Sequence, residues 1–176
     1  MEKNGRVLGV LGGFYTVRTD EGTVECRGRG SLRKQGVSPL AGDLVRVTVQ
    51  EDGTGAIEEL LARKNALRRP PVANVDCLVL VSSVTDPAPN LPVLDAMIAL
   101  AEEQEIEPII VFNKSDLEEA AALHALYEQA GFRTFTVSAE TGDGVEALKA
   151  ALSGKICVFS GNSGVGKSSL LKRLDP

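Results

Sequence analysis

Nine consecutive residues near the end of the chain have the types and the spacing of a phosphate-binding loop. They fit the pattern G-x-x-x-x-G-K-[ST] and are Gly161, Asn162, Ser163, Gly164, Val165, Gly166, Lys167, Ser168 and Ser169. Glycines let such a loop curl until successive backbone N–H groups point at phosphate oxygens, and the following helix adds the positive end of its dipole. In this pattern the lysine reaches the β- and γ-phosphates and the next hydroxyl holds Mg²⁺, so Lys167 and Ser168 are the predicted catalytic residues.

A second group of polar residues predicts that the base is guanine. Asn113, Lys114 and Asp116 directly follow the apolar run 109–112, at the carboxyl end of a predicted strand, where open α/β sheets bind ligands. The Asp116 carboxylate can accept hydrogen bonds from N1–H and the 2-amino group of guanine. Adenine has no donor at either position and would leave the carboxylate unpaired, which is costly. Lys114 can lay its stem over the base, and Asn113 can tie this loop to the phosphate loop.

A third loop follows the next predicted strand, 132–137, and begins with Ser138 and Ala139. The backbone N–H of Ala139 can donate to O6 of guanine, where adenine presents a donor instead. Loops rich in Asn, Lys, Ser and Asp are common after strands, so one such loop is weak evidence of a base-binding site. Two of them together with a phosphate loop in one sheet favour GTP over ATP.

These loops lie in a part of the chain that alternates between strands and helices from residue 75 onward. Strands are predicted at 77–81, 109–112, 132–137 and 156–159, and helices at 91–104, 117–130, 145–151 and from 168. Such alternation builds a mostly parallel, doubly wound sheet with helices on both faces.

The first third of the chain has a different pattern, with five short β-prone runs between residues 5 and 61. The break at 20–22 between two of these runs is a hairpin signal. Five strands in so short a segment predict a small barrel, of which the OB-fold is the favoured kind. We assign 1–64 to an OB-fold-like RNA-binding domain, 65–74 to a linker and 75–176 to the α/β domain. Within the linker, the Pro70–Pro71 pair predicts a break in strand pairing.

A basic loop on this barrel suggests contact with a nucleic-acid backbone. Its cationic residues are Arg27, Arg29, Arg33 and Lys34. A solvated loop without a partner explains the same residues equally well. Aromatic residues for base stacking are few, so any RNA contact is expected to depend on phosphates and shape.

Composition describes an ordinary globular protein with an uneven charge. The chain has 176 residues and a net charge of −5, and residues 1–72 hold 12 Lys and Arg against 9 Asp and Glu, whereas the remainder holds 7 against 15. No apolar run is long enough for a membrane span, and the N-terminus lacks the apolar core of a signal peptide. Cys26, Cys77 and Cys157 are far apart in sequence and indicate neither a disulfide framework nor a zinc site. We therefore expect a cytoplasmic protein, and we expect it to be a monomer.

The order of the three loops is unusual for a P-loop GTPase, because the base-specific loops precede the phosphate loop. This order predicts a circularly permuted GTPase domain. Together with the barrel and the stretch LRRPPVANVD at 67–76, it resembles the ribosome small subunit-dependent GTPase A family, known as RsgA, YjeQ or YloQ. The resemblance implies an enzyme that hydrolyses GTP to GDP and phosphate, binds the small ribosomal subunit late in its assembly and contacts ribosomal RNA through its barrel. By matching positions, residues 113–116 recognise guanine and residues 161–169 hold the phosphates and Mg²⁺.

The sequence also departs from the family pattern. After the phosphate loop the family continues with a threonine-bearing switch, a D-x-x-G switch and a C-terminal domain with Cys and His ligands for zinc, and within the 176 residues none of these follows that loop. We therefore expect the chain to be part of a longer protein, with a GTPase domain incomplete at its C-terminus and weak or absent hydrolysis. Its four predicted strands correspond to one flank of the family's sheet, so the strand that leads into the phosphate loop is expected to lie at an edge. Two alternatives stay open: a non-catalytic, nucleotide-dependent RNA-binding module, and an ATP-using P-loop enzyme.

Overall fold

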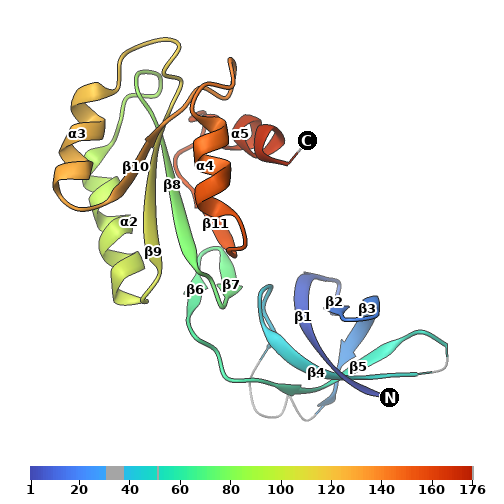
Figure 1. Ribbon diagram of the computed structural model, residues 1–176. Coiled ribbons are helices and arrows are strands. Elements are labelled where there is room, and N and C mark those ends of the chain that lie inside the picture. Colours follow the sequence, from blue (N-terminus) through green and yellow to red (C-terminus); the bar gives the residue numbers. More distant parts are fainter. Residues whose placement is uncertain (31–37, 51, 176) are drawn as a thin grey trace. The chain divides into compact units, whose positions relative to one another are not determined.

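The computed structural model describes residues 1–30, 38–50 and 52–175. The chain divides into two compact units, Met1–Val75 and Asp76–Pro176 (Figure 1). Each unit has a hydrophobic core of its own. Within the described residues, no helix combines the length and the apolar character that crossing a membrane requires.

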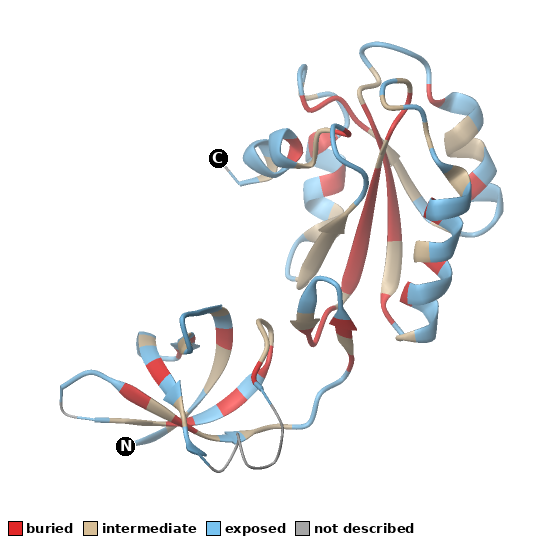
Figure 2. Ribbon diagram, turned by 180° about the vertical axis from the view of Figure 1, so that it is seen from behind, coloured by how far each residue is buried: buried red, intermediate tan, exposed pale blue. Residues whose placement is uncertain are grey.

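The first unit contains a closed five-stranded barrel, as the sequence predicted. Its strands are β1 (Glu2–Leu11), β2 (Phe14–Thr19), β3 (Gly22–Gly28), β4 (Leu44–Val49) and β5 (Gly55–Leu60). They follow the order β1-β2-β3-β5-β4, and pairing of β1 with β4 closes the barrel. Alternate residues point inward and fill the interior with Val7, Val17, Cys26, Val45, Val47 and Ile57. This alternation appears in Figure 2 as short red segments along the barrel strands.

The segment predicted as a linker contains a hairpin. Strands β6 (Ala66–Arg68) and β7 (Pro71–Ala73) pair antiparallel, so the prediction that the two prolines interrupt strand pairing was wrong. The pair is compatible with a hairpin because Pro70 lies in its turn and Pro71 is the first residue of β7, where a strand tolerates proline. Side-chain hydrogen bonds of Asn65 to the backbone of Val75 close the base of the hairpin at 2.8 and 2.9 Å.

The second unit is a parallel sheet of four strands. They are β8 (Cys77–Ser83), β9 (Glu107–Asn113), β10 (Arg133–Thr136) and β11 (Cys157–Ser160), in the order β10-β9-β8-β11. The continuous apolar run of β8 is buried along its length, as expected for a central parallel strand covered on both faces (Figure 2). Among the described strands β11 is at the end of the sheet, which confirms its predicted edge position.

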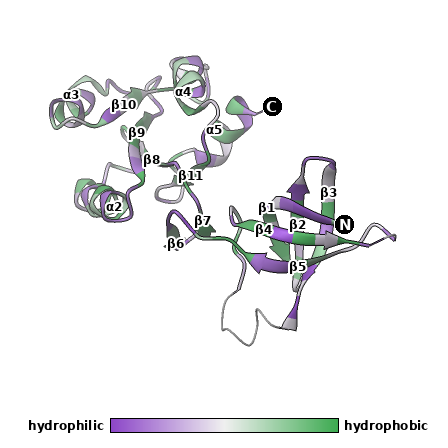
Figure 3. Ribbon diagram, turned by 60° about the horizontal axis from the view of Figure 1, so that its bottom comes forward, coloured by the Kyte–Doolittle hydropathy of each residue, from purple (hydrophilic) through white to green (hydrophobic). Residues whose placement is uncertain are grey.

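Four helices cover this sheet. They are α2 (Leu91–Glu103), α3 (Ala121–Gln129), α4 (Val145–Leu152) and α5 (Lys167–Leu174). Figure 3 shows α2 and α3 on one face and α4 and α5 on the other, which confirms the predicted doubly wound arrangement. On the first face the rings of Phe112 and Tyr127 lie 5.9 Å apart, and on the second Leu148 and Leu170 are fully buried. Helix α3 begins four residues later than predicted, because Leu117 belongs to a turn in which its N–H donates to Lys114.

Candidate nucleotide-binding site

The loop between β11 and α5 has a shape that only glycine permits at two of its positions. Gly161 has a φ of +147°, and a Cβ on it would lie 2.1 Å from the carbonyl oxygen of Val81. Gly166 has a φ of +90°, and its Cβ would lie 2.3 Å from Nδ2 of Asn113. Both positions therefore exclude a side chain. Val165, between these two glycines, is 2% exposed and anchors the loop in the core of the unit.

A cation and the start of a helix meet at the same end of this loop. Lys167 is the first residue of α5, and its ammonium group donates to the carbonyls of Gly161 at 2.7 Å and Asn162 at 2.6 Å. Ser168 and Ser169 lie exposed in the first turn of the helix. A helix N-terminus with a lysine beside it attracts anions, and phosphate groups fit this arrangement.

Asn113 joins three loops through one buried side chain. It ends β9 and is 1% exposed. Its Nδ2 donates to the carbonyl of Val165 in the phosphate loop at 2.8 Å, and its Oδ1 accepts from the N–H of Ala139 at 3.0 Å. The side chain therefore places the phosphate loop and the two other loops in one arrangement.

The carboxylate of Asp116 is oriented by Ser138. The Ser138 hydroxyl donates to Oδ1 of Asp116 at 2.5 Å and accepts from the N–H of Thr141 at 3.0 Å. Ser138 is fully buried, whereas Asp116 is exposed. Oδ2 of Asp116 has no hydrogen bond to another described residue, so this oxygen is available to a ligand.

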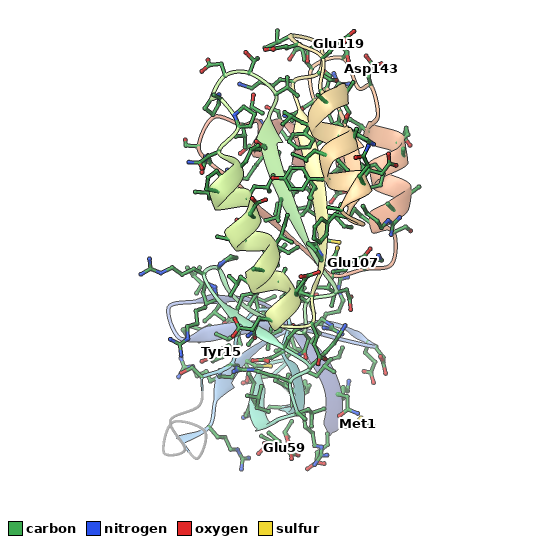
Figure 4. All side chains as sticks on the ribbon, turned by 90° about the vertical axis from the view of Figure 1, so that its left-hand side faces the viewer. Met1, Tyr15, Glu59, Glu107, Glu119 and Asp143 are labelled. Carbon is green, nitrogen blue, oxygen red and sulfur yellow. The ribbon has the colours of Figure 1, made fainter. Side chains whose placement is uncertain are left out.

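A cavity of about 230 Å³ lies where these loops meet. It is lined by Asn113, Lys114, Asp116, Leu117, Ala139, Glu140, Gly166 and Ser169. Lys114 has a φ of +67°, and its ammonium group donates to the carbonyl of Asp86. The loops emerge at one end of the unit, where Figure 4 shows Glu119 and Asp143, while Glu107 at the start of β9 lies at the other end. The cavity thus places a base-sized hollow beside the phosphate loop.

One residue that holds this site was not found by sequence reasoning. Arg173, in the last turn of α5, donates through Nε to the carbonyl of Ala139 at 3.0 Å and through Nη2 to the carbonyl of Glu140. No motif marks it, because its partners lie in a loop more than thirty residues earlier in the chain. Only the packing of α5 beside the third loop identifies it.

The basic residues proposed for RNA contact are engaged differently from one another. The guanidinium of Arg27 lies over the ring of Phe14, 4.6 Å from its centroid, and Arg29 pairs with Glu58 at 3.0 Å. Arg33 and Lys34 lie outside the described residues. A hollow of about 350 Å³ beside the first pair is lined by Gly12, Gly13, Phe14, Arg27, Gly28 and Gly30. Tyr15, in contrast, packs against the barrel core.

Comparison with known proteins gives one consistent result for both units. The model of the RsgA GTPase family matches residues 60–176, and the model of the RsgA N-terminal domain matches residues 4–57. The Small ribosomal subunit biogenesis GTPase RsgA of Caldanaerobacter subterraneus subsp. tengcongensis is 45% identical over 170 residues, which cover 95% of this chain and 58% of that protein. The Small ribosomal subunit biogenesis GTPase RsgA of Alkaliphilus metalliredigens is 44% identical over 177 residues, which cover 98% of this chain and 61% of that protein. The chain thus spans about 60% of the length of these relatives.

Two solved structures have the same fold. The crystal structure of YjeQ from Thermotoga maritima is 39% identical with a TM-score of 0.89, covering 100% of this chain and 66% of that one. The crystal structure of YloQ, described as a circularly permuted GTPase, is 36% identical with a TM-score of 0.84, and the match covers 97% of this chain and 63% of that one. Both likenesses extend over the barrel and the α/β unit.

Proposed function

Because this chain belongs to the RsgA family of circularly permuted GTPases, we propose that it binds GTP and GDP at the site described above and serves in GTP hydrolysis during small-subunit biogenesis. The observation that carries the proposal is the side chain of Asn113, which joins the phosphate loop to the two loops lining the adjoining cavity. A nucleotide needs its phosphate site and its base site at a set distance, and this buried side chain sets that distance. The relatives of known name are GTPases of small ribosomal subunit biogenesis.

Guanine recognition is assigned to the cavity. The Asp116 carboxylate, oriented by Ser138, accepts from N1–H and the 2-amino group, and Lys114 covers the base with its stem. The third loop supplies the donor to O6. The N–H of Ala139, predicted for this role, donates instead to Oδ1 of Asn113 at 3.0 Å. Adenine lacks both donors for the carboxylate and is disfavoured on that ground.

Phosphate binding is assigned to residues 161–169, with Lys167 and Ser168 in the catalytic roles. A magnesium ion fits this site by the chemistry of its donors, because Ser168 offers an exposed hydroxyl oxygen in the first turn of α5. Mg²⁺ in such sites takes one or two protein ligands together with substrate phosphates, so a cluster of carboxylates is not required. When bound, the ion neutralises charge on the β- and γ-phosphate oxygens. The described residues contain no group of three or more His, Cys, Asp and Glu suited to a metal, and we assign zinc to none of them.

The barrel, residues 1–64, is proposed to contact ribosomal RNA of the small subunit. Arg27 and Phe14, which stack on each other, both line the hollow, and such a combination of a cation and an aromatic ring binds nucleic-acid backbones and bases. Residues 75–176 are then the nucleotide-binding domain, joined to the barrel through 65–74. A role on the ribosome implies a cytoplasmic location, and we propose that the protein acts as a monomer.

Equilibrium binding of fluorescent GDP and ADP to the whole chain tests the nucleotide assignment. We expect GDP to bind roughly 100-fold more tightly than ADP, because adenine leaves the Asp116 carboxylate unpaired. Asp116→Asn is expected to lose the guanine preference and to gain affinity for xanthosine diphosphate, since the amide can donate to the added O2 of xanthine. Glu119→Gln is the matched control, because it removes one exposed carboxylate from the same loop without touching the cavity. Equal affinity for GDP and ADP in the unsubstituted chain would contradict the proposal and favour an ATP-using enzyme.

Hydrolysis separates an enzyme from a non-catalytic RNA-binding module. Single-turnover GTP hydrolysis is measured with and without small ribosomal subunits, and we expect a weak rate from the chain alone that the subunits stimulate. Lys167→Ala is expected to abolish the stimulated rate, because the γ-phosphate loses its cation. If GDP binds but the rate stays at the uncatalysed level in both conditions, this chain acts as the module.

A further inference from the structure

Arg173 connects the far end of α5 to the loop that lines the base cavity. Its guanidinium donates to two successive carbonyls, those of Ala139 and Glu140, and both residues line the cavity. A planar guanidinium with several donors holds two acceptors in a fixed geometry, which a lysine ammonium does less well. The contact therefore restrains the orientation of two consecutive peptide groups.

The first restrained peptide group presents a free backbone donor. The Ala139–Glu140 bond is trans, so its carbonyl and its N–H point in opposite directions. Because the carbonyl points at Arg173, the N–H of Glu140 points away from it, and this N–H has no hydrogen bond to another described residue. The N–H of Ala139 is already bonded to Asn113. The free N–H of Glu140 is thus the donor that this loop can offer to O6 of a base.

The second restrained peptide group leads to Asp116. The carbonyl of Glu140 and the N–H of Thr141 belong to one planar unit, and that N–H donates to Oγ of Ser138 at 3.0 Å. The same Ser138 hydroxyl donates to Oδ1 of Asp116 at 2.5 Å. A change at Arg173 therefore reaches the carboxylate that recognises guanine through a short series of hydrogen bonds.

We propose that Arg173 is a positioning residue for base recognition, which sets the N–H of Glu140 and the carboxylate of Asp116 for guanine and links them to the phosphate-binding helix. The inference rests on the proposed function. The phosphate ligand Lys167 begins the same helix that carries Arg173 in its last turn. Phosphates bound at the start of α5, and a base bound in the cavity whose loop Arg173 holds, thereby stabilise the same arrangement of the helix and the loop.

Three variants and four probes test this role. The variants are Arg173→Gln, the conservative Arg173→Lys, and Lys172→Gln, which removes the same charge from the neighbouring residue of α5. The probes are GDP, ADP, inosine diphosphate, which lacks the 2-amino group, and tripolyphosphate, which has no base. Affinities come from competition against fluorescent GDP, and circular dichroism checks the fold of each variant.

We expect Arg173→Gln to weaken GDP binding by about tenfold or more and to lower the ratio of GDP affinity to ADP affinity by a similar factor. The reason is that the N–H of Glu140 and the carboxylate of Asp116 are no longer held in position for the base. Tripolyphosphate affinity is expected to stay within about twofold. Arg173→Lys should recover part of the ratio, since one ammonium group can reach one carbonyl. Lys172→Gln should leave every affinity unchanged.

A loss of affinity for GDP, ADP and tripolyphosphate by the same factor would overturn the inference, because a merely structural role of Arg173 would change all three affinities together. An unchanged GDP-to-ADP ratio in both Arg173 variants would overturn it as well. If Arg173→Gln fails to fold, the ratio measured for Arg173→Lys decides the question. The unsubstituted chain distinguishes this outcome from failure of the proposed function. If the proposed function is wrong, that chain shows no preference for GDP over ADP, and the inference loses its basis.

Discussion

Cys77 and Cys157 are separated by 80 residues, yet their sulfur atoms lie 2.8 Å apart. They are register partners on the neighbouring strands β8 and β11, and the thiol of Cys77 donates to the sulfur of Cys157. This hydrogen bond lowers the pKa of Cys157, whereas it raises the pKa of Cys77, which burial raises further. Burial also raises the pKa of the third cysteine, Cys26, to about 11. The three thiols should therefore differ in reactivity.

Alkylation by iodoacetamide, followed by peptide mass spectrometry, measures that difference. We expect Cys157 to react first, because the thiolate is the nucleophile and a lowered pKa makes it available at lower pH. Cys77→Ala removes the donor and should raise the pH at which Cys157 begins to react, while Cys77→Ser keeps a donor and should shift it less. Cys26→Ala is the control and should change nothing at Cys157. Alkylation of Cys26 at the same rate as Cys157 would contradict this ordering.

At the scale of elements, the phosphate loop depends on β9 as well as on its own glycines. Gly166 leaves room for Nδ2 of Asn113, which reaches past it to the carbonyl of Val165. A side chain at position 166 therefore affects two loops at once. The strand that carries Asn113 is buried on both faces and holds that side chain in place.

Gly166→Ala is expected to reduce GDP affinity by roughly 100-fold or more, because its Cβ displaces Asn113 and an L-residue at this φ is strained by about 1–2 kcal/mol. Gly154→Ala is the matched control, since Gly154 has a similar φ of +73° and its Cβ would meet nothing within 4 Å. The Gly154→Ala control should lose about 1 kcal/mol in its free energy of unfolding and keep its affinity for GDP. Titration with fluorescent GDP and thermal unfolding provide the two readouts. Equal loss of affinity in both variants would show that backbone strain alone disturbs the loop.

At the scale of the whole molecule, each unit is stabilised by its own core and its own polar contacts. In the first unit Asp43 is fully buried and accepts from Nε and Nη2 of Arg63, both at 2.8 Å, and from the N–H of Leu40 at 2.6 Å. A buried carboxylate needs such partners, and losing one of them leaves a charge without compensation. The second unit contains the proposed nucleotide site and a separate core.

Arg63→Met is expected to lower the free energy of unfolding of residues 1–75 by about 2–3 kcal/mol, a value below that of a fully buried pair because Arg63 is partly solvated. Affinity for GDP should stay unchanged. Hydrogen–deuterium exchange reports the two units separately. Arg46→Met is the control, because its ion pair with Glu59 is exposed and contributes roughly 0–1 kcal/mol. A comparable loss of protection in residues 76–176 would show that the units are not stabilised independently.

Local patterns predicted much of the fold and of the site. Alternating residues indicated the barrel strands, the apolar run of β8 indicated a central parallel strand, and the glycine spacing indicated the phosphate loop. These features depend on residues close together in the chain, because backbone conformation and the period of burial are local properties. The start of α3 was predicted too early, because Leu117 lies in a turn although its neighbours favour a helix. The hairpin at 66–73 was missed, because hydrogen bonds from Asn65 close its base against the preference of two prolines for a break in strand pairing.

The sequence by itself thus determined the kinds of element and the permuted order of the loops, and it carries the residue types of the proposed guanine-nucleotide site. Only the tertiary structure decided which groups meet: Asn113 with the phosphate loop, Cys77 with Cys157, and Arg173 with the carbonyls of the third loop. Each of these contacts joins residues from different strands or helices. Their meeting depends on strand order and register, which pair residues that are far apart in sequence and which no local pattern encodes.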